Sequence, residues 1–207
     1  MKKIILMAAM AVMTSTAFAQ LMTGKSAAIS KEFKNKTFYL QWNPSSIVPD
    51  KGSSQSFTGF SIGLNKAWGV SSSLPLYIES GLGIQFSFYS EDDADYKMLS
   101  AKIPLSLQYV YEIPNSSVEI IPNLGLDFRI NAVGTAEYNG KDYNLFDKDD
   151  MGGDDYTWNR FQVGWHIGAN ARFNKKWLVG VSYGTDFSEI AKKAKIHTTS
   201  VTLGVCF

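Results

Sequence analysis

The sequence has few of the residues on which most disulfide scaffolds and metal sites depend. Its 207 residues include one cysteine, Cys206, and two histidines, so an intramolecular disulfide is excluded and no cluster has the spacing of a metal site. Basic and acidic residues number 20 and 19, which gives no general attraction to nucleic acid. After residue 19 the sequence also lacks an apolar run long enough to cross a bilayer as a helix. We therefore expect no metal, no cofactor and no nucleic-acid partner, and we interpret Cys206 as a small packing residue.

The N-terminal residues have the pattern of a secretory signal peptide. Two lysines precede an apolar stretch at 4–13, and an Ala-Phe-Ala cleavage pattern ends at Ala19. The stretch is shorter than the roughly 20 residues that a spanning helix needs. We predict a cleaved signal peptide at 1–19 and a single domain at 20–207, because no linker or repeat divides the remainder. Loss of the two lysines changes 20 basic residues to 18 against 19 acidic ones, a net charge of −1.

Segments of the mature chain alternate large apolar residues with glycine or polar residues. In residues 75–89, one face carries Leu76, Ile78, Leu82, Ile84, Phe86 and Phe88, and the other carries Tyr77, Glu79, Gly81, Gly83, Gln85 and Ser87. A period of two is typical of a strand whose faces meet different surroundings. The same template predicts eight strands, at 36–43, 57–67, 75–89, 97–111, 118–132, 157–173, 177–187 and 196–207. Strands of about ten residues, tilted near 45°, match the height of the apolar band of an outer-membrane barrel.

The predicted connections alternate between long and short. Long external loops are expected at 44–56, 90–96, 133–156 and 188–195, and short turns at 68–74, 112–117 and 174–176. This alternation is typical of barrels with long external loops and short periplasmic turns. With both termini in the periplasm, two aromatic girdles emerge, with Trp42, Phe88 and Phe187 at the outer interface and Tyr109, Tyr111, Trp177 and Phe207 at the inner one.

The side of each strand that faces lipid decides the class of barrel. A soluble lipocalin-type barrel has an apolar lumen, whereas a membrane-spanning barrel has a polar lumen and an apolar outer face. Eight strands leave an interior just wide enough for side chains, and the glycine-rich polar face fits there better than the bulky apolar face. We therefore predict an all-β protein, a single closed antiparallel up-and-down transmembrane barrel of eight strands, with a soluble exported barrel as the alternative. Pro104 and Pro122 lie inside predicted strands, so we expect bulges or strand ends at both.

Several motifs resemble the porin-like outer-membrane β-barrel domain of small Gram-negative barrels. The resemblance covers nearly all of the mature chain and is carried by residues 102–105 running on to Gln108-Tyr109, by residues 122–128, by residues 164–173 and by the last strand with its terminal Phe207. It implies a fold and a route of biogenesis more than a chemistry. In such families the barrel assembly machinery reads the terminal aromatic residue and the apolar residues at alternate positions before it. The residues that match this assembly signal are Val201, Leu203, Val205 and Phe207.

Charged residues fall on the face that we place in the lumen. They are Glu79, Lys102, Asp127, Arg129, Arg160, His166 and Arg172. An isolated buried charge is costly, so we expect these groups to pair in a structural polar network. A gated ion path through the network is the alternative. The second histidine, His197, is predicted to face outward, and we interpret both histidines as structural.

A lipid A-modifying enzyme is a further alternative. Some small outer-membrane barrels are lipid A deacylases that use a serine beside a histidine, often as His-x-Ser on one strand face. Here the corresponding stretch is His166-Ile167-Gly168, which lacks the serine. Ser182 on an adjacent strand would serve only if the strand register brought it close to His166. We therefore expect that the chain is not an enzyme.

The predicted loops carry charges of both signs. The third loop contains Asp142, Asp147, Asp149, Asp150, Asp154 and Asp155, and the second contains Glu91, Asp92, Asp93 and Asp95. These runs lack the ordered spacing of a calcium loop, so we expect solvated acidic loops, with a calcium site as the alternative. Lys192, Lys193 and Lys195 in the fourth loop would lie near lipopolysaccharide phosphates.

These features predict an outer-membrane protein with a structural or adhesion-type surface role through its external loops. The expected partners are outer-membrane lipid, lipopolysaccharide and, during biogenesis, the barrel assembly machinery; no pattern names a surface ligand. The alternatives, in order, are a narrow channel for small solutes or ions, the lipid-modifying enzyme and a soluble ligand-binding barrel.

Overall fold

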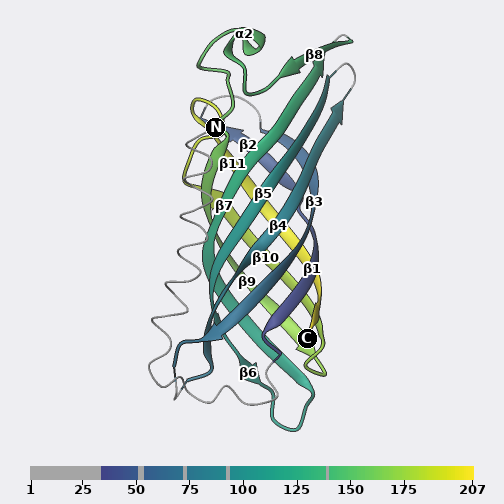
Figure 1. The fold of residues 1–207 in the computed structure, drawn as a ribbon, viewed down its shortest axis with the longest axis vertical. Coiled ribbons are helices and arrows are strands. Elements are labelled where there is room, and N and C mark those ends of the chain that lie inside the picture. The colour runs from purple at the N-terminus through teal and green to yellow at the C-terminus, as the bar shows by residue number, and fades with distance from the viewer. Residues whose placement is uncertain (1–33, 51–53, 72–73, 92–93, 139) are drawn as a thin grey trace.

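The computed structural model describes residues 34–50, 54–71, 74–91, 94–138 and 140–207, and most of them form long tilted strands (Figure 1). The predicted signal peptide lies outside these residues. The main strands are β1 (Lys36–Trp42), β2 (Ser45–Pro49), β3 (Gln55–Gly69), β4 (Leu76–Glu91), β5 (Ala94–Tyr109), β7 (Val118–Tyr138), β9 (Phe161–Phe173), β10 (Trp177–Asp186) and β11 (Ala194–Cys206). The shorter elements are β6 (Tyr111–Glu112), β8 (Lys141–Asn144) and the helix α2 (Lys148–Met151). Among the described residues, no helix has the length and apolar character needed to cross a membrane.

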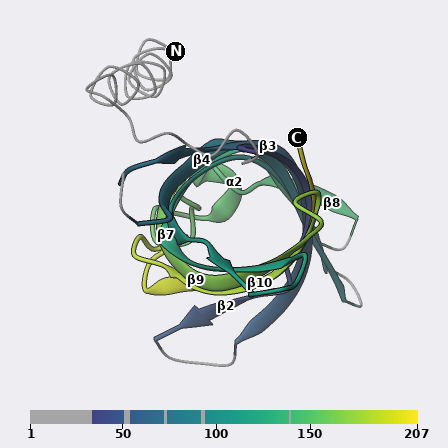
Figure 2. The ribbon, with the colours of Figure 1, turned by 90° about the horizontal axis from the view of Figure 1, so that it is seen from below.

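The main strands close into a ring. They are hydrogen-bonded in the order β1-β11-β10-β9-β7-β5-β4-β3-β2, and β1 also pairs with β3. Leu40 of β1 shows the closure, because its register partners are Leu203 of β11 and Ile62 of β3. β2 continues beyond β1 and pairs with the same two neighbours. The described residues therefore form an eight-strand antiparallel ring, which Figure 2 shows end-on. This ring confirms the predicted barrel.

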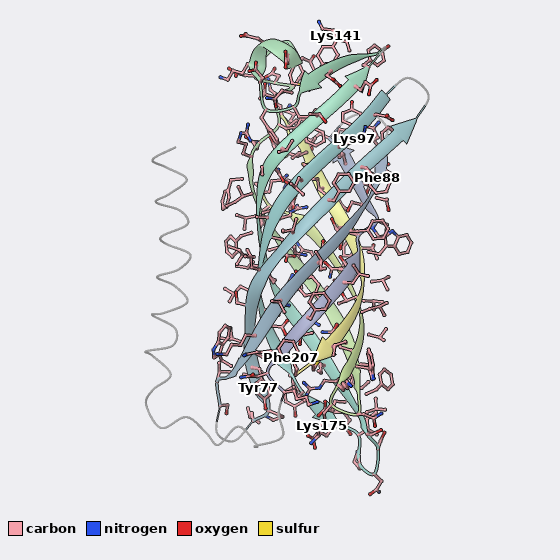
Figure 3. The ribbon with its side chains drawn as sticks, turned by 45° about the vertical axis from the view of Figure 1, so that its right-hand side comes forward. Tyr77, Phe88, Lys97, Lys141, Lys175 and Phe207 are labelled. Carbon is pink, nitrogen blue, oxygen red and sulfur yellow. The ribbon has the colours of Figure 1, made fainter. Side chains whose placement is uncertain are left out.

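The two faces of each strand have opposite chemistry. On β4, Leu82 and Ile84 are 59% and 56% exposed, whereas the neighbouring Gln85 is 3% exposed. The same alternation repeats around the ring, so large apolar side chains project from the outside of the barrel (Figure 3) and serine, asparagine, glutamine and charged residues lie inside. An outer surface this apolar is unfavourable in water and favourable in lipid. The faces are therefore those predicted for a membrane-spanning barrel.

Aromatic side chains lie near both ends of the apolar band. Figure 3 shows Phe88 towards one end and Phe207 at the other. The predicted girdle residues are exposed on the outside, including Trp42 at 47% and Trp177 at 54%. The end that carries β8 and α2 is called the external end below, in keeping with the predicted orientation, and the other is the periplasmic end.

The strand bounds differ from the prediction mainly at the external end. β2 lies inside the predicted loop 44–56, and β7 continues to Tyr138 with β8 paired back along it, inside the predicted loop 133–156. β9 begins at Phe161, later than the predicted start at residue 157. Prolines at both borders of β2 weaken its sequence signal. The upper part of β7 extends beyond the membrane band, where an apolar face is no longer required.

Pro104 and Pro122 neither bulge nor end a strand, contrary to the prediction. Pro104 pairs with Asp127 in continuous β5–β7 register, and Pro122 lies within continuous β7–β9 register. The β4–β5 ladder skips the position of Pro104 without changing register, and the Ser80 hydroxyl donates to the Pro104 carbonyl at 2.8 Å. The register shift of the β5–β7 ladder lies between Leu99 and Ser100 instead, with Ala132 of β7 as the extra residue. A missing proline N–H thus removes local pairing without displacing the strand.

Candidate functional site in the lumen and at the external end

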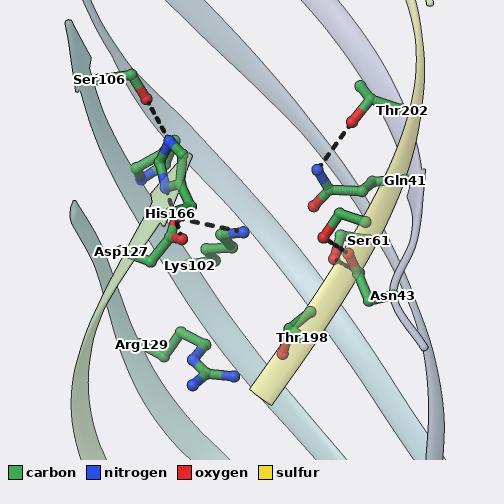
Figure 4. A network of polar contacts seen from close by, with 12 residues as sticks. Gln41, Asn43, Ser61, Lys102, Ser106, Asp127, Arg129, His166, Thr198 and Thr202 are labelled. Atoms are coloured by element: carbon green, nitrogen blue, oxygen red, sulfur yellow. Dashed lines mark hydrogen bonds and ion pairs between the residues drawn. The ribbon is translucent and has the colours of Figure 1, made fainter. Parts of the chain in front are cut away.

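A chain of polar contacts joins β5, β7 and β9 inside the lumen (Figure 4). Asp127 Oδ1 lies 3.3 Å from Lys102 Nζ, and Asp127 Oδ2 lies 2.8 Å from His166 Nδ1. The other ring nitrogen, His166 Nε2, lies 3.0 Å from Ser106 Oγ. The Asp127 carboxylate therefore contacts both the Lys102 ammonium group and the His166 imidazole, and the imidazole in turn contacts the Ser106 hydroxyl. The sequence singled out Lys102, Asp127 and His166 but not Ser106.

The strand register explains how the His166 ring reaches Ser106. His166 on β9 pairs with Gly125 on β7, and Gly125 pairs with Ser106 on β5, so the three residues lie in one row. Because glycine has no side chain, the imidazole can pass over it. A Cβ at Gly125 would lie 2.8 Å from both His166 Cε1 and Ser106 Cα. The glycine in the Leu124-Gly125-Leu126 pattern is therefore needed for this contact.

Two buried ion pairs complete the charged wall. Arg129 of β7 pairs with Asp186 of β10, and Arg172 of β9 pairs with Glu119 of β7. All four side chains are nearly inaccessible to solvent, and such pairs persist only with well-placed partners. Sequence reasoning found the two arginines but missed both acids. Each acid is in phase with the inward residues of its own strand, and this phase was the signal that could have found them.

Glu79 and Arg160, the remaining predicted lumen residues, lie in different surroundings. Glu79 lines the lumen and accepts a hydrogen bond from Asn65 Nδ2 at 3.0 Å. Arg160 is exposed at the external end, where it donates to the Ala132 carbonyl at 2.9 Å and lies over the Phe146 ring at 4.2 Å. The structure therefore places Arg160 outside the lumen network, contrary to the prediction. The reason is that the alternation of β9 begins only after this residue.

A polar cavity of about 100 Å³ adjoins these groups. Ser106, His166 and Asp127 line it together with Lys102 and Arg129. Such a cavity is roomy and polar enough for water or a small polar solute, and too small for a large one. Within the described ranges there is no group of three or more histidine, cysteine, aspartate or glutamate residues placed to hold a metal ion.

The third loop folds over the external mouth of the barrel. β8 pairs with the end of β7, and α2, capped by Asp147, is seen within the circle of strands in Figure 2. Leu145 is fully buried; its N–H donates to the Gly134 carbonyl at 3.1 Å, and its carbonyl accepts from the Trp158 N–H at 2.8 Å. The Trp158 ring stacks on Tyr96 of β5 with centroids 6.1 Å apart. Backbone and side-chain contacts thus fix both ends of the loop to the wall.

An apolar cluster lies beside this loop. It joins β2, β3 and β11 to the segment between α2 and β9 that contains Trp158. Its members are Ile47, Phe57, Trp158, Ile190, Ala194 and Ile196. Ile190 and Ile196 are almost completely buried. Burial of each such side chain stabilises the fold by about 1.5–3 kcal/mol, so the external end has a small core of its own.

Ion pairs connect the charged loops. Lys192 Nζ lies 2.6 Å from Asp155 Oδ2, and Lys148 pairs with Asp154. The hydrogen bond from each lysine to its carboxylate partner, and the partner's charge, raise the pKa of the lysine above its ordinary value. Exposed pairs add little stability, but the first pair ties the fourth loop to the third.

The sequence matches the family described as outer membrane protein beta-barrel domain over residues 5–207. The chain belongs to this family. Its place is therefore the outer membrane, which agrees with the apolar outer face and the polar lumen. Among curated proteins, no relative matches the sequence.

Solved structures of other outer-membrane proteins resemble this outer-membrane barrel at low sequence identity. The attachment invasion locus protein of Yersinia pestis is 13% identical, with a TM-score of 0.48, 84% of this chain covered and 99% of that chain. Neisserial surface protein A is 16% identical, with a TM-score of 0.49, 83% of this chain and 97% of that chain covered. OprG of Pseudomonas aeruginosa is 13% identical, with a TM-score of 0.38, 84% of this chain and 97% of that chain covered. The family match, and not these distant likenesses, identifies the chain.

The second histidine of this outer-membrane barrel faces outward, as predicted. His197 Nδ1 lies 2.8 Å from the hydroxyl of Tyr183, which is 45% exposed. The first histidine, His166, faces the lumen, and its register partner on β10 is Gly184. Ser182 pairs instead with Gly168 of β9. The hydroxyl partner of His166 is therefore supplied by β5, and not by Ser182.

The last strand of the barrel presents the predicted assembly residues on one face. Val201, Leu203 and Val205 alternate with inward-facing residues along β11, and Leu203 and Phe207 are 53% and 54% exposed. Cys206 is buried, with its sulfur 3.5 Å from Thr37 Oγ1. The strand thus offers an outward apolar row, and its recognition by the assembly machinery stays a prediction.

Proposed function

We propose that this outer-membrane barrel acts at the cell surface through its external end, as a structural or adhesion-type protein whose lumen is plugged by its own side chains. The observation that carries the proposal is the fixed third loop, in which Leu145 is fully buried. A loop that is already ordered loses less conformational entropy on binding than a mobile one. The external end therefore offers a preformed surface.

The lumen supports the plugged state. Arginine, lysine and carboxylate side chains occupy the bore and pair within it, as in the Arg129–Asp186 and Lys102–Asp127 pairs. An eight-strand wall leaves room for side chains and little else. We therefore expect the barrel to meet its surface partners through its rim and not to conduct through its bore.

The surface role is tested by releasing the third loop. Cells that display the protein should adhere to epithelial cell layers better than cells without it, and Leu145→Asp should abolish most of the gain because the loop loses its anchor. The matched control is Leu74→Asp, since Leu74 is exposed at the periplasmic end. Equal adherence with and without the wild-type protein would contradict an adhesion role.

Lipopolysaccharide is the lipid partner that we propose for the fourth loop. Lys193 and Lys195 are exposed beside Lys192, which pairs with Asp155. Lysine attracts phosphate as a point charge, and this attraction weakens with salt. The double variant Lys193→Gln, Lys195→Gln should bind purified lipopolysaccharide more weakly at low salt, while Lys97→Gln on β5 should not. Equal binding by both variants would remove this partner.

A narrow ion path is the second candidate, because the lumen contains the polar cavity of about 100 Å³. Planar bilayer recordings separate the two functions. The plugged barrel should show little steady conductance, whereas large, steady conductance in the wild type would favour the channel.

A further inference from the structure

Beyond the surface role, we propose that Ser106, His166 and Asp127 form a nucleophilic centre inside the lumen, at which Ser106 accepts the acyl group of a small carboxylic ester. This proposal departs from the sequence-based expectation that the chain is not an enzyme. That expectation rested on a missing serine beside His166 along β9, and the structure supplies a serine from β5.

The three side chains have the order that activates a serine. The Asp127 carboxylate holds His166 at Nδ1, 2.8 Å away, which leaves Nε2 to accept a proton from Ser106 Oγ at 3.0 Å. A carboxylate in this position fixes the tautomer of the ring and stabilises the imidazolium that forms. A serine is a weak nucleophile by itself, and an adjacent base of this kind is what activates it.

The arrangement is built into the register of three neighbouring strands. Ser106, Gly125 and His166 form one row, and Asp127 follows Gly125 on the same face of β7. Strands hold side chains more precisely than loops do, so the contacts need no rearrangement to form. Gly125 is required because any Cβ there would meet both the ring and Ser106 Cα.

The adjoining cavity determines the size and polarity of the substrate. It measures about 100 Å³, and all three members of the centre line it. Lys102 and Arg129 line the same cavity and bring positive charge to it. Glu79, Asp127 and Asp186 line the cavity as well, so Lys102 and Arg129 act as individual N–H donors. A cationic donor beside the reacting carbonyl stabilises the oxyanion that develops when the carbonyl is attacked. A short-chain ester of a small alcohol fits these limits, and a lipid with long acyl chains does not.

The reaction follows from these positions. Ser106 Oγ bonds to the ester carbonyl carbon as its proton passes to His166 Nε2, which gives a tetrahedral oxyanion. The bond to the alkoxy oxygen then breaks, and that oxygen leaves as an alcohol with the proton from Nε2. A water molecule repeats the two transfers on the acyl-serine, releasing a carboxylic acid and restoring the hydroxyl.

The test measures covalent labelling of the refolded full barrel by methanesulfonyl fluoride, a small serine sulfonylating reagent. Attack by Ser106 displaces fluoride, and intact mass followed by peptide mapping locates the sulfonyl group. Ser200 is the matched control, because it lines the same cavity and its hydroxyl donates to Asn43 Oδ1 at 2.8 Å instead of to a histidine. A general base contributes about 100-fold or more, so Ser106 should react at least that much faster than Ser200.

Variants separate an activated serine from a structural hydrogen bond. Ser106→Ala should remove the label and Ser200→Ala should leave it, with both proteins still shifting on electrophoresis after heating, as folded barrels do. His166→Gln should slow labelling of Ser106, because the hydroxyl loses its base, and should leave labelling of Ser200 unchanged. Hydrolysis of a short-chain ester should be lost in Ser106→Ala and retained in Ser200→Ala.

Equal labelling of Ser106 and Ser200 would overturn the proposal, because it would show that His166 does not activate the hydroxyl. Labelling of neither serine would also overturn it, since the centre then admits no molecule of the proposed size. Neither result bears on adherence through the third loop, so this centre and the surface role can fail separately.

Discussion

At the residue scale, each strongly charged side chain in the wall lies against a partner of opposite charge or a hydrogen-bonding group. Arg129 meets Asp186, Arg172 meets Glu119, and Glu79 accepts from Asn65. Removing both members of a buried pair is often nearly neutral, whereas removing one member leaves the other buried without a partner. The stability loss caused by a mutation in the lumen should therefore depend on whether it leaves a buried charge without its partner.

Arg129→Ala should lower the free energy of unfolding by about 3–5 kcal/mol, because Asp186 would stay buried without its cation. The double variant Arg129→Ala, Asp186→Ala should recover part of this loss. Both variants should gain conductance in planar bilayers, since both lose the bulk of the guanidinium. Chemical denaturation in detergent measures the free energy of unfolding. The assignment of the pair would be contradicted if the double variant lost as much of this free energy as the two single variants, Arg129→Ala and Asp186→Ala, lose together.

Leu82→Arg should destabilise the barrel by about 2–4 kcal/mol, because the side chain lies on the lipid face near the middle of β4. Phe187→Arg is the control, since Phe187 is 57% exposed, close to the 59% of Leu82, but lies just beyond β10 at the external interface. The control should cost about 0–1 kcal/mol. Similar losses at both positions, measured by refolding into lipid vesicles, would show that the depth assignment is wrong.

At the element scale, the strands within the membrane band and their neighbours were predictable, and the residue register between them was not. The alternation around Leu82 and Gln85 fixes which face meets lipid, because a shift of one residue would invert the whole strand. The alternation cannot say which residues share a row, so the Ser106–Gly125–His166 row had to come from the structure. Outside the band the constraint disappears, which is why β2 was missed and Arg160 was misplaced.

Deleting Phe207 should reduce the amount of barrel assembled in the outer membrane while leaving export unchanged. The physical reason is that Phe207 ends the outward apolar row of β11, the strand that closes the ring against β1. Cell fractionation and electrophoresis without heating measure the assembled fraction. Deleting Lys34, which precedes β1, serves as a single-residue deletion outside that row. Full assembly without Phe207 would remove the assembly role of this residue.

At the scale of the whole molecule, the closed ring satisfies backbone hydrogen bonds around its circumference and exposes apolar side chains outside it. Such a body is stable in lipid or detergent and not in water. β1 provides the closure by pairing with β11 and β3, so no strand edge faces lipid along the membrane band of the described barrel.

The purified protein should therefore require detergent and migrate differently on electrophoresis before and after boiling. Detergent alone should not open the ring, because its backbone hydrogen bonds are shielded within an apolar surface. A sample heated in detergent provides the unfolded reference. A protein that stays monomeric and soluble without detergent would contradict the membrane class.

The Arg129–Asp186 pair also constrains how the barrel enters the membrane. Its members lie on β7 and β10, with β9 between them, so they meet only when these three strands are paired. A flat sheet inserted beforehand would expose both charges to hydrocarbon, at a cost of several kcal/mol. The sheet must then curve as it inserts into the bilayer. A late assembly intermediate should lie at the lipid surface with its polar face in contact with water. The same pair that stabilises the finished wall thereby makes its entry into lipid a concerted event.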